Sequence, residues 1–202
     1  MCEMSKSKKK TWIAITGTMA SGKSTVLKYL KQCGYDTYDC DSINFDLQQI
    51  NQKGYIEIVN TFGNNILDEN KNIDRKKLAS IIFSNELEKQ KLEQIMHPLI
   101  LEKLNDIRSN IQDLTFVEVP LLYELNWQKY FDEDWLVISE HSKLIERCIR
   151  DRNMKLNQIE ERIKTQMNVE EKIKKAKVII KNDSTLFDLY KQIDQLIERR
   201  TK

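Results

Sequence analysis

The feature that most constrains this chain is a glycine-rich segment between an apolar run and a helix pattern. Residues 17–24 read Gly-Thr-Met-Ala-Ser-Gly-Lys-Ser and fill the pattern G-x-x-x-x-G-K-[ST]. Residues 11–16 are apolar and rich in β-branched side chains, which is typical of a buried parallel strand. Residues 23–32 read as a helix that ends at Gly34. This order predicts a phosphate-binding loop.

The chemistry of such a loop follows from its backbone and from two side chains. Glycines allow close wrapping, so that successive N–H groups and the positive end of the helix hold phosphate oxygens. Lys23 is expected to reach the β- and γ-phosphates, and the Ser24 hydroxyl to ligate Mg²⁺. We therefore predict ATP and Mg²⁺ as cofactors. The predicted nucleotide-binding residues of the loop are Gly17, Thr18, Met19, Ala20, Ser21, Gly22, Lys23, Ser24 and Thr25.

The composition limits the number of domains and the kinds of binding partner. The 202 residues, 40% of them hydrophobic, are enough for a single α/β domain with an inserted subdomain. A net charge of +2 gives no global field that would attract nucleic acid or a membrane, and no membrane span is predicted. The lysines near the start, from Lys6 to Lys10, are interpreted as a solvated tail. A monomer is expected, with a weak oligomer as the alternative.

The cysteine pattern bears on the compartment. Cys2, Cys33, Cys40 and Cys148 form no C-x-x-C pair, and the two histidines lie at no metal-binding spacing from them. We interpret them as reduced thiols of a cytoplasmic protein.

The remaining pattern alternates strands with helices. A strand is predicted at residues 35–39, which are half polar and therefore nearer an edge of the sheet, and buried strands are predicted at residues 115–119, 135–139 and 178–180. With residues 11–16 they predict a five-stranded parallel sheet in a three-layer α/β fold. Residues 42–109 look helical, with amphipathic stretches at 45–52, 75–83, 87–96 and 98–107, and are interpreted as an inserted acceptor-binding subdomain. Between the last two predicted strands lies the highly charged helical region 143–175.

Other motifs narrow the class of nucleotide-binding protein. A GTPase would carry Asn-Lys-x-Asp, and Asn182-Asp183 lacks the intervening lysine. The strand that carries Glu118 ends at Pro120, without the Asp-Glu pair expected of motor-type ATPases. A small-molecule kinase remains.

At this point the chain resembles the dephospho-CoA kinase family from Ile13 to Ile197. The motifs that carry the resemblance occur in order at the phosphate loop, Asp39-Cys40-Asp41, Phe62-Gly63 through Ile73-Asp74-Arg75, His97-Pro98-Leu99-Ile100, Val119-Pro120-Leu121-Leu122-Tyr123-Glu124, Gln166-Met167 with Glu170-Glu171-Lys172, and Asn182. The resemblance implies a phosphate-loop core, a helical CoA-binding insertion and a small helical lid. It also implies that ATP and dephospho-CoA give ADP and CoA, with Mg²⁺ required.

Asp41 is the predicted catalytic base, because an acceptor hydroxyl must be oriented and relieved of its proton near the phosphate loop. The resemblance points to the same residue. The alternative is that Asp41 caps a helix beginning at Ser42.

An arginine of the lid is predicted to stabilise the phosphoryl group in transit. Arg152 is favoured over Arg147 and Arg150. The family usually shows Arg-Asp-Gly at the end of this helix, and this chain departs from that pattern with Arg152-Asn153-Met154. A solvated helical face is the alternative for each of them.

The remaining site residues depend more on the resemblance. Asn182 is a predicted adenine contact. His97, followed by Pro98 at an expected helix start, is interpreted as a structural or substrate-contacting residue, with a direct chemical role as the alternative. Acceptor contacts are also predicted at Pro120, Leu121, Leu122 and Glu124, with core packing as the alternative for the leucines. Two other functions stay open, a nucleotide or nucleoside kinase and an ATP-dependent switch protein.

Overall fold

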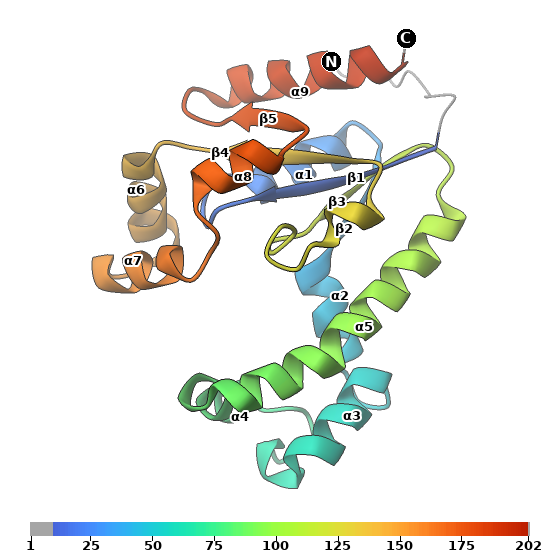
Figure 1. The fold of residues 1–202 in the computed structure, drawn as a ribbon, viewed down its shortest axis with the longest axis vertical. Coiled ribbons are helices and arrows are strands. Elements are labelled where there is room, and N and C mark those ends of the chain that lie inside the picture. Colours follow the sequence, from blue (N-terminus) through green and yellow to red (C-terminus); the bar gives the residue numbers. More distant parts are fainter. Residues whose placement is uncertain (1–9, 202) are drawn as a thin grey trace. The chain divides into compact units, whose positions relative to one another are not determined.

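A parallel β-sheet forms the centre of the first of two compact units in a computed structural model that describes residues 10–201. The strands are β1 (Thr11–Gly17), β2 (Asp36–Asp39), β3 (Leu114–Glu118), β4 (Glu133–Ile138) and β5 (Val178–Lys181). They are all parallel and lie in the order β2-β3-β1-β4-β5 (Figure 1). The predicted five-stranded parallel sheet is confirmed.

Both faces of this sheet are covered, which explains the nearly continuous apolar run of β1. Ile13 and Ile15 join a core formed with α1 (Lys23–Gln32) and α9 (Leu186–Thr201). Trp12, which precedes Ile13 and points to the opposite face in the alternation, stacks on Phe131, with ring centroids 5.6 Å apart. In Figure 1, α8 (Val169–Lys175) lies in front of the sheet and α1 behind it. The result is the predicted three-layer α/β fold.

The charged region between β4 and β5 contains three helices. They are α6 (His141–Arg152), α7 (Leu156–Lys164) and α8. Asn153 in the left-handed region ends α6. Buried Met19, Cys148 and Ile159 pack together with partly buried side chains of α6 and α7, so these helices contact the loop after β1.

The second compact unit, Cys40–Asn110, is helical. It contains α2 (Cys40–Leu47), α3 (Lys53–Phe62), the 3₁₀ turn η1 (Asn64–Ile66), α4 (Arg75–Ser84) and α5 (Glu86–Asn110). The remaining short element, η2 (Trp127–Tyr130), belongs to the first unit. None of the helices within residues 10–201 has the length and apolar character needed to cross a membrane.

Three predictions about the helical unit were wrong. α2 begins at Cys40 and ends at Leu47, whereas the prediction ran over 45–52, and α3 was not predicted. The predicted break at Pro98 is absent, because α5 continues through this proline. Met96, Ile100 and Leu104 are buried at four-residue spacing on both sides of Pro98, so the apolar stripe that packs α5 is continuous. Packing thus outweighs the local preference of proline.

Candidate active site

The phosphate loop lies between β1 and α1, where glycine is required at two points by close neighbours. A Cβ on Gly17 would lie 2.2 Å from the Val137 carbonyl oxygen. Gly22 has φ +103°, and a Cβ there would lie 2.1 Å from Nδ2 of Asn182. Both positions therefore exclude a side chain, and Gly22 also needs backbone freedom that only glycine supplies cheaply. The loop is tightly held against β4 and the residue after β5.

Lys23, the first residue of α1, folds back across the phosphate loop. Its Nζ donates hydrogen bonds to the carbonyl oxygens of Gly17 and Thr18, both at 3.1 Å. The side chain is buried, which orders a long and flexible chain. This places the ammonium group over the loop, where it is suited to neutralise phosphate oxygens.

A cavity of about 410 Å³ opens beside the loop within the first unit. It brings together the phosphate loop, the end of β3, α6 and the segment after β5. Four cationic side chains and two acidic ones line it, so its charge favours an anionic ligand. Its lining residues are Ala20, Gly22, Lys23, Ser24, Thr25, Glu118, Arg147, Arg150, Asp151, Arg152, Asn182, Ser184 and Leu186.

Asn182 is tied to the phosphate loop by its side chain. Its Nδ2 donates to the Ser21 carbonyl at 2.8 Å, a buried hydrogen bond. Its own carbonyl accepts from Arg147 at 2.8 Å and from the Ser139 hydroxyl at 2.9 Å. The residue predicted as an adenine contact thus lines the cavity and also fixes the loop backbone that the phosphates would contact.

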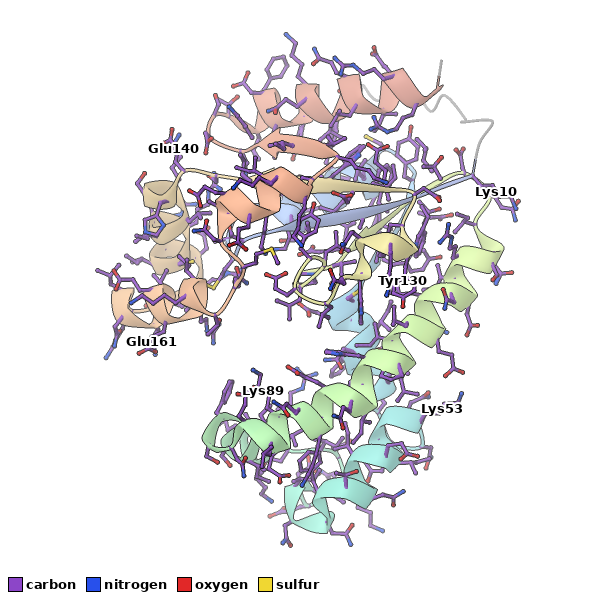
Figure 2. All side chains as sticks on the ribbon, in the orientation of Figure 1. Lys10, Lys53, Lys89, Tyr130, Glu140 and Glu161 are labelled. Carbon is purple, nitrogen blue, oxygen red and sulfur yellow. The ribbon has the colours of Figure 1, made fainter. Side chains whose placement is uncertain are left out.

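Asp183, the next residue, holds the start of α6. Its Oδ1 accepts from the Ser139 hydroxyl at 2.9 Å and from the backbone N–H of Glu140 at 2.6 Å. Glu140, labelled in Figure 2, immediately precedes α6. A carboxylate beside the first turn also interacts favourably with the helix dipole.

The three arginines of α6 have different surroundings. Arg147 donates to the Ala20 carbonyl at 3.3 Å and to Ser139 at 3.2 Å in addition to Asn182, so it links α6 to the phosphate loop. Arg150 forms ion pairs with Asp151 and Glu146. Arg152 is exposed at the cavity, and no residue of the described chain forms a hydrogen bond or ion pair with it. Arg152 is therefore the arginine whose guanidinium is uncommitted.

The predicted acceptor residues after β3 divide into buried and exposed positions. Leu122 is fully buried and belongs to the core, whereas Leu121 is 38% exposed. The Pro120 carbonyl accepts a long hydrogen bond from the Thr16 hydroxyl at 3.5 Å. Glu124 Oε1 accepts from the Met167 N–H at 3.0 Å and lies 2.8 Å from Nζ of Lys172. The carboxylate of Glu124 thus contacts both the segment between α7 and α8 and the helix α8 itself.

Asp41 and His97 lie in the second unit. Asp41 is the second residue of α2, which begins at Cys40, two residues before the predicted helix start at Ser42. Asp39, two residues earlier, pairs in register with Glu118 at the carboxyl ends of β2 and β3. His97 is a partly buried residue inside α5, where burial lowers its pKa and Glu93 partly opposes the shift.

The second unit also has a cavity of its own, about 520 Å³ in volume. It lies among α2, α3 and α5, and neither Asp41 nor His97 lines it. Lys53, labelled in Figure 2, contributes to its wall and forms an ion pair with Glu102 at 2.6 Å.

The first cavity fits Mg²⁺ that is held together with a triphosphate. Ser24 supplies a hydroxyl and Glu118 a carboxylate to the same cavity. Within residues 10–201 there is no cluster of three or more metal-ligating side chains. Because Mg²⁺ retains waters and is commonly bound by one or two side chains plus phosphate oxygens, this small donor set is appropriate for it.

Several residues at the first cavity carry no local sequence signal. Arg147 belongs to a highly charged helix, and its contacts with Ala20, Ser139 and Asn182 depend on the folded positions of three separate segments. Lys172 looks like any lysine of a charged helix, yet its side chain is completely buried. Their partners are distant in the chain, so spacing alone does not reveal them.

Comparisons with known proteins agree over nearly the whole chain. Residues 11–188 match a family model described as dephospho-CoA kinase. A Fusobacterium nucleatum protein named dephospho-CoA kinase is 41% identical over 187 residues, 92% of this chain and 96% of that protein. A solved Thermus thermophilus structure gives a TM-score of 0.82 at 27% identity and covers 95% of this chain and 98% of that one. Dephospho-CoA kinase from Campylobacter jejuni gives 0.68 at 28%, with coverages of 93% and 95%.

Proposed function

Because the chain belongs to the dephospho-CoA kinase family, we propose that it transfers the γ-phosphoryl group of ATP to the ribose 3'-hydroxyl of dephospho-CoA. The products are ADP and CoA, and the reaction is the last step of coenzyme A biosynthesis. The family match confirms the resemblance found in the ordered motifs of the sequence. The observation that carries the proposal is the cationic cavity in which the phosphate loop, Lys23 and the lid arginines meet.

ATP would occupy this cavity with its phosphates on the loop. Backbone N–H groups of the loop and the ammonium of Lys23 would hold the β- and γ-phosphates. Mg²⁺, when bound, would be held by the phosphates and Ser24 and would neutralise charge that develops on the phosphoryl oxygens. Asn182 would fix the loop beneath the phosphates and border the adenine.

The transfer itself requires a base and a cation. As the acceptor oxygen bonds to the γ-phosphorus, the bond from that phosphorus to the bridging oxygen of ADP breaks, and the hydroxyl proton passes to the carboxylate of Asp41. The free guanidinium of Arg152 would stabilise the phosphoryl group in transit.

The acceptor would be bound by the helical unit and by the turn after β3. We propose that residues 42–109 hold dephospho-CoA, with His97 at the substrate, and that residues 143–175 act as the lid. Pro120 and the exposed Leu121 are suited to contact the acceptor, whereas Leu122 and Glu124 would act by supporting that turn. At neutral pH the lowered pKa of His97 favours an uncharged imidazole at this contact.

We also propose a cytoplasmic, monomeric enzyme. Cys33, Cys40 and Cys148 are free and buried thiols, as expected in a reducing compartment. Cys2 and the lysines of the tail before Lys10 lie outside the described residues.

The direct test uses purified protein with ATP, Mg²⁺ and dephospho-CoA. Mass spectrometry should find a product heavier by one phosphoryl group, and fragmentation should place that group on the ribose 3' position. Parallel reactions with nucleoside monophosphates provide the competing outcome. Preferential phosphorylation of a nucleotide would reject the proposed acceptor and leave the phosphate loop intact as an ATP site.

A further inference from the structure

A buried ion pair lies outside the phosphate loop, and one of its two members is a lysine. The Lys172 side chain on α8 has no exposed surface, and its Nζ lies 2.8 Å from Glu124 Oε1. The Glu124 side chain is 18% exposed, and within residues 10–201 no second carboxylate pairs with Lys172. Burying an ammonium and a carboxylate is costly, and an apolar pair of similar volume often serves stability as well. The location of this pair therefore suggests a role beyond holding the core together.

The pair lies at the end of the lid. Glu124 Oε1, which contacts Lys172, also accepts the backbone N–H of Met167 at 3.0 Å. Met167 lies between α7 and α8, where the lid returns to the core. A single carboxylate oxygen thus contacts both Met167, in the segment between α7 and α8, and the buried lysine of α8.

The neighbouring residue carries this connection to the phosphate loop. Oε1 of Gln166 accepts the backbone N–H of Met19 at 3.2 Å. The Met19 side chain packs with Cys148 of α6 and Ile159 of α7, which are also lid helices. Residues 166 and 167 therefore connect the phosphate loop on one side to Glu124 and Lys172 on the other.

We propose that Lys172 and Glu124 are positioning residues for phosphoryl transfer. Their ion pair fixes the segment at Gln166 and Met167, and through it sets the position of the Met19 N–H and of the lid helix that carries Arg152. This inference rests on the proposed kinase function for its kinetic test. Lys172 itself touches neither ATP nor the acceptor in this role.

The kinetic test compares Lys172→Met with Lys174→Met, an exposed lysine of the same helix. Lys172→Met should lower kcat roughly tenfold or more and raise the KM for ATP, because small misplacements of catalytic groups are costly, while the KM for dephospho-CoA stays the same. Lys174→Met should match the wild type. Rates are expressed per folded protein, measured by active-site titration with a tight nucleotide analogue.

A second variant separates positioning from folding. Gln166→Ala removes the acceptor of the Met19 N–H without touching the buried pair, so it should reproduce the rise in KM for ATP. Combined with Lys172→Met, it should add little further loss, because the two residues act through one connection. Lys172→Arg should recover part of the activity. If Lys172→Met does not fold, the kinetics of Gln166→Ala decide between the outcomes. A wild-type kcat and a wild-type KM for ATP in Gln166→Ala would then overturn the proposal.

A readout that needs no turnover distinguishes this inference from the proposed function. In hydrogen exchange, Lys172→Met should accelerate the amides of residues 18–20 as well as those near 167, whereas Lys174→Met should leave both unchanged. If the wild type fails to phosphorylate dephospho-CoA but this exchange pattern appears, the proposed substrate is wrong and the connection stands. If the wild type is active and Lys172→Met leaves both loop exchange and kcat unchanged, the connection is rejected.

Discussion

Gly22 shows how a single atom determines the shape of the phosphate loop. Its φ of +103° is strained for other residues, and the space for a Cβ is taken by Asn182 Nδ2. Gly22→Ala should therefore displace the Asn182 amide from the Ser21 carbonyl and disturb the loop backbone. We expect ATP affinity to fall by roughly tenfold or more, equivalent to about 1.4 kcal/mol, measured by titration calorimetry.

Gly63 provides a matched control in the same chain. Its φ of +77° is also in the left-handed region, but no atom lies within 4 Å of a Cβ built there. Gly63→Ala should cost about 1 to 2 kcal/mol of stability through backbone strain and leave ATP affinity unchanged. Equal losses of ATP affinity in the two variants would contradict the argument from the contact with Asn182.

Asp41 and Lys23 should give different kinetic patterns if their proposed roles are right, because both variants lose turnover but only one loses ATP binding. Asp41→Asn keeps the size of the side chain but removes the proton acceptor, so kcat should drop by about 10² or more while the dissociation constant for ATP stays unchanged. Lys23→Ala should reduce both turnover and ATP binding, because it removes a group that holds phosphates. Rapid-quench and equilibrium nucleotide titrations measure the two quantities. Unchanged turnover in Asp41→Asn would exclude it as the base.

At this scale the sequence predicted residue types better than residue partners. The spacing of Gly17, Gly22, Lys23 and Ser24 located the loop, because that chemistry depends on consecutive backbone atoms. The roles proposed for Asp41, His97 and Arg152 stay predictions. The pairing of Lys172 with Glu124 was not predictable, since a buried lysine and an exposed one have the same local sequence pattern.

At the scale of elements, α5 is the clearest case of packing outweighing local preference. Pro98 lacks an N–H and crowds the preceding turn, yet the helix runs from Glu86 to Asn110. Pro98→Ala should add a helical hydrogen bond and raise the free energy of unfolding by about 1 to 3 kcal/mol, less a small loss from greater freedom of the unfolded chain. Denaturant unfolding at constant pH measures the change.

The other proline of the chain gives the comparison for this prediction. Pro120 follows β3 in a turn, so Pro120→Ala has the same effect on the unfolded chain but offers no helical hydrogen bond. It should be neutral or slightly destabilising. A loss of stability in Pro98→Ala would instead mean that the path of α5 depends on this proline.

The accuracy of the predicted elements followed the strength of their patterns. The strands were placed within about two residues, because buried parallel strands are short apolar runs. α3 was missed: it contains Gly54 and several β-branched residues, which lower helix preference. Gly54 permits close packing, since a Cβ there would lie 2.6 Å from the Leu47 carbonyl oxygen. Tertiary contacts of this kind produce no periodic pattern in the sequence.

For the whole molecule, His97 predicts a component of acid sensitivity. Burial lowers its pKa, so the folded chain binds this proton less tightly than the unfolded chain does. The resulting stability is present above the ordinary pKa of about 6.5 and is lost as the pH falls below it. His97→Gln should therefore lose less stability than the wild type between about pH 7.5 and 5.5, measured by thermal unfolding across that range.

Carboxylates that titrate at lower pH affect the two proteins equally, so the difference between the curves isolates His97. A His97→Gln curve parallel to that of the wild type would show that the imidazole titrates normally in the folded chain.

The adjacency of β2 and β3 has a consequence for how such an enzyme diversifies. The helical unit Cys40–Asn110 leaves the sheet from one of these strands and returns to the other, and the two are paired in register. A parallel connection needs only about a dozen residues to cross over. The pairing of β2 with β3 therefore constrains the two ends of this segment but little of the sequence between them. The segment can be exchanged without changing the order of the strands. Substitutions can therefore accumulate within this segment while the phosphate loop, which belongs to the other unit, keeps its hydrogen bonds.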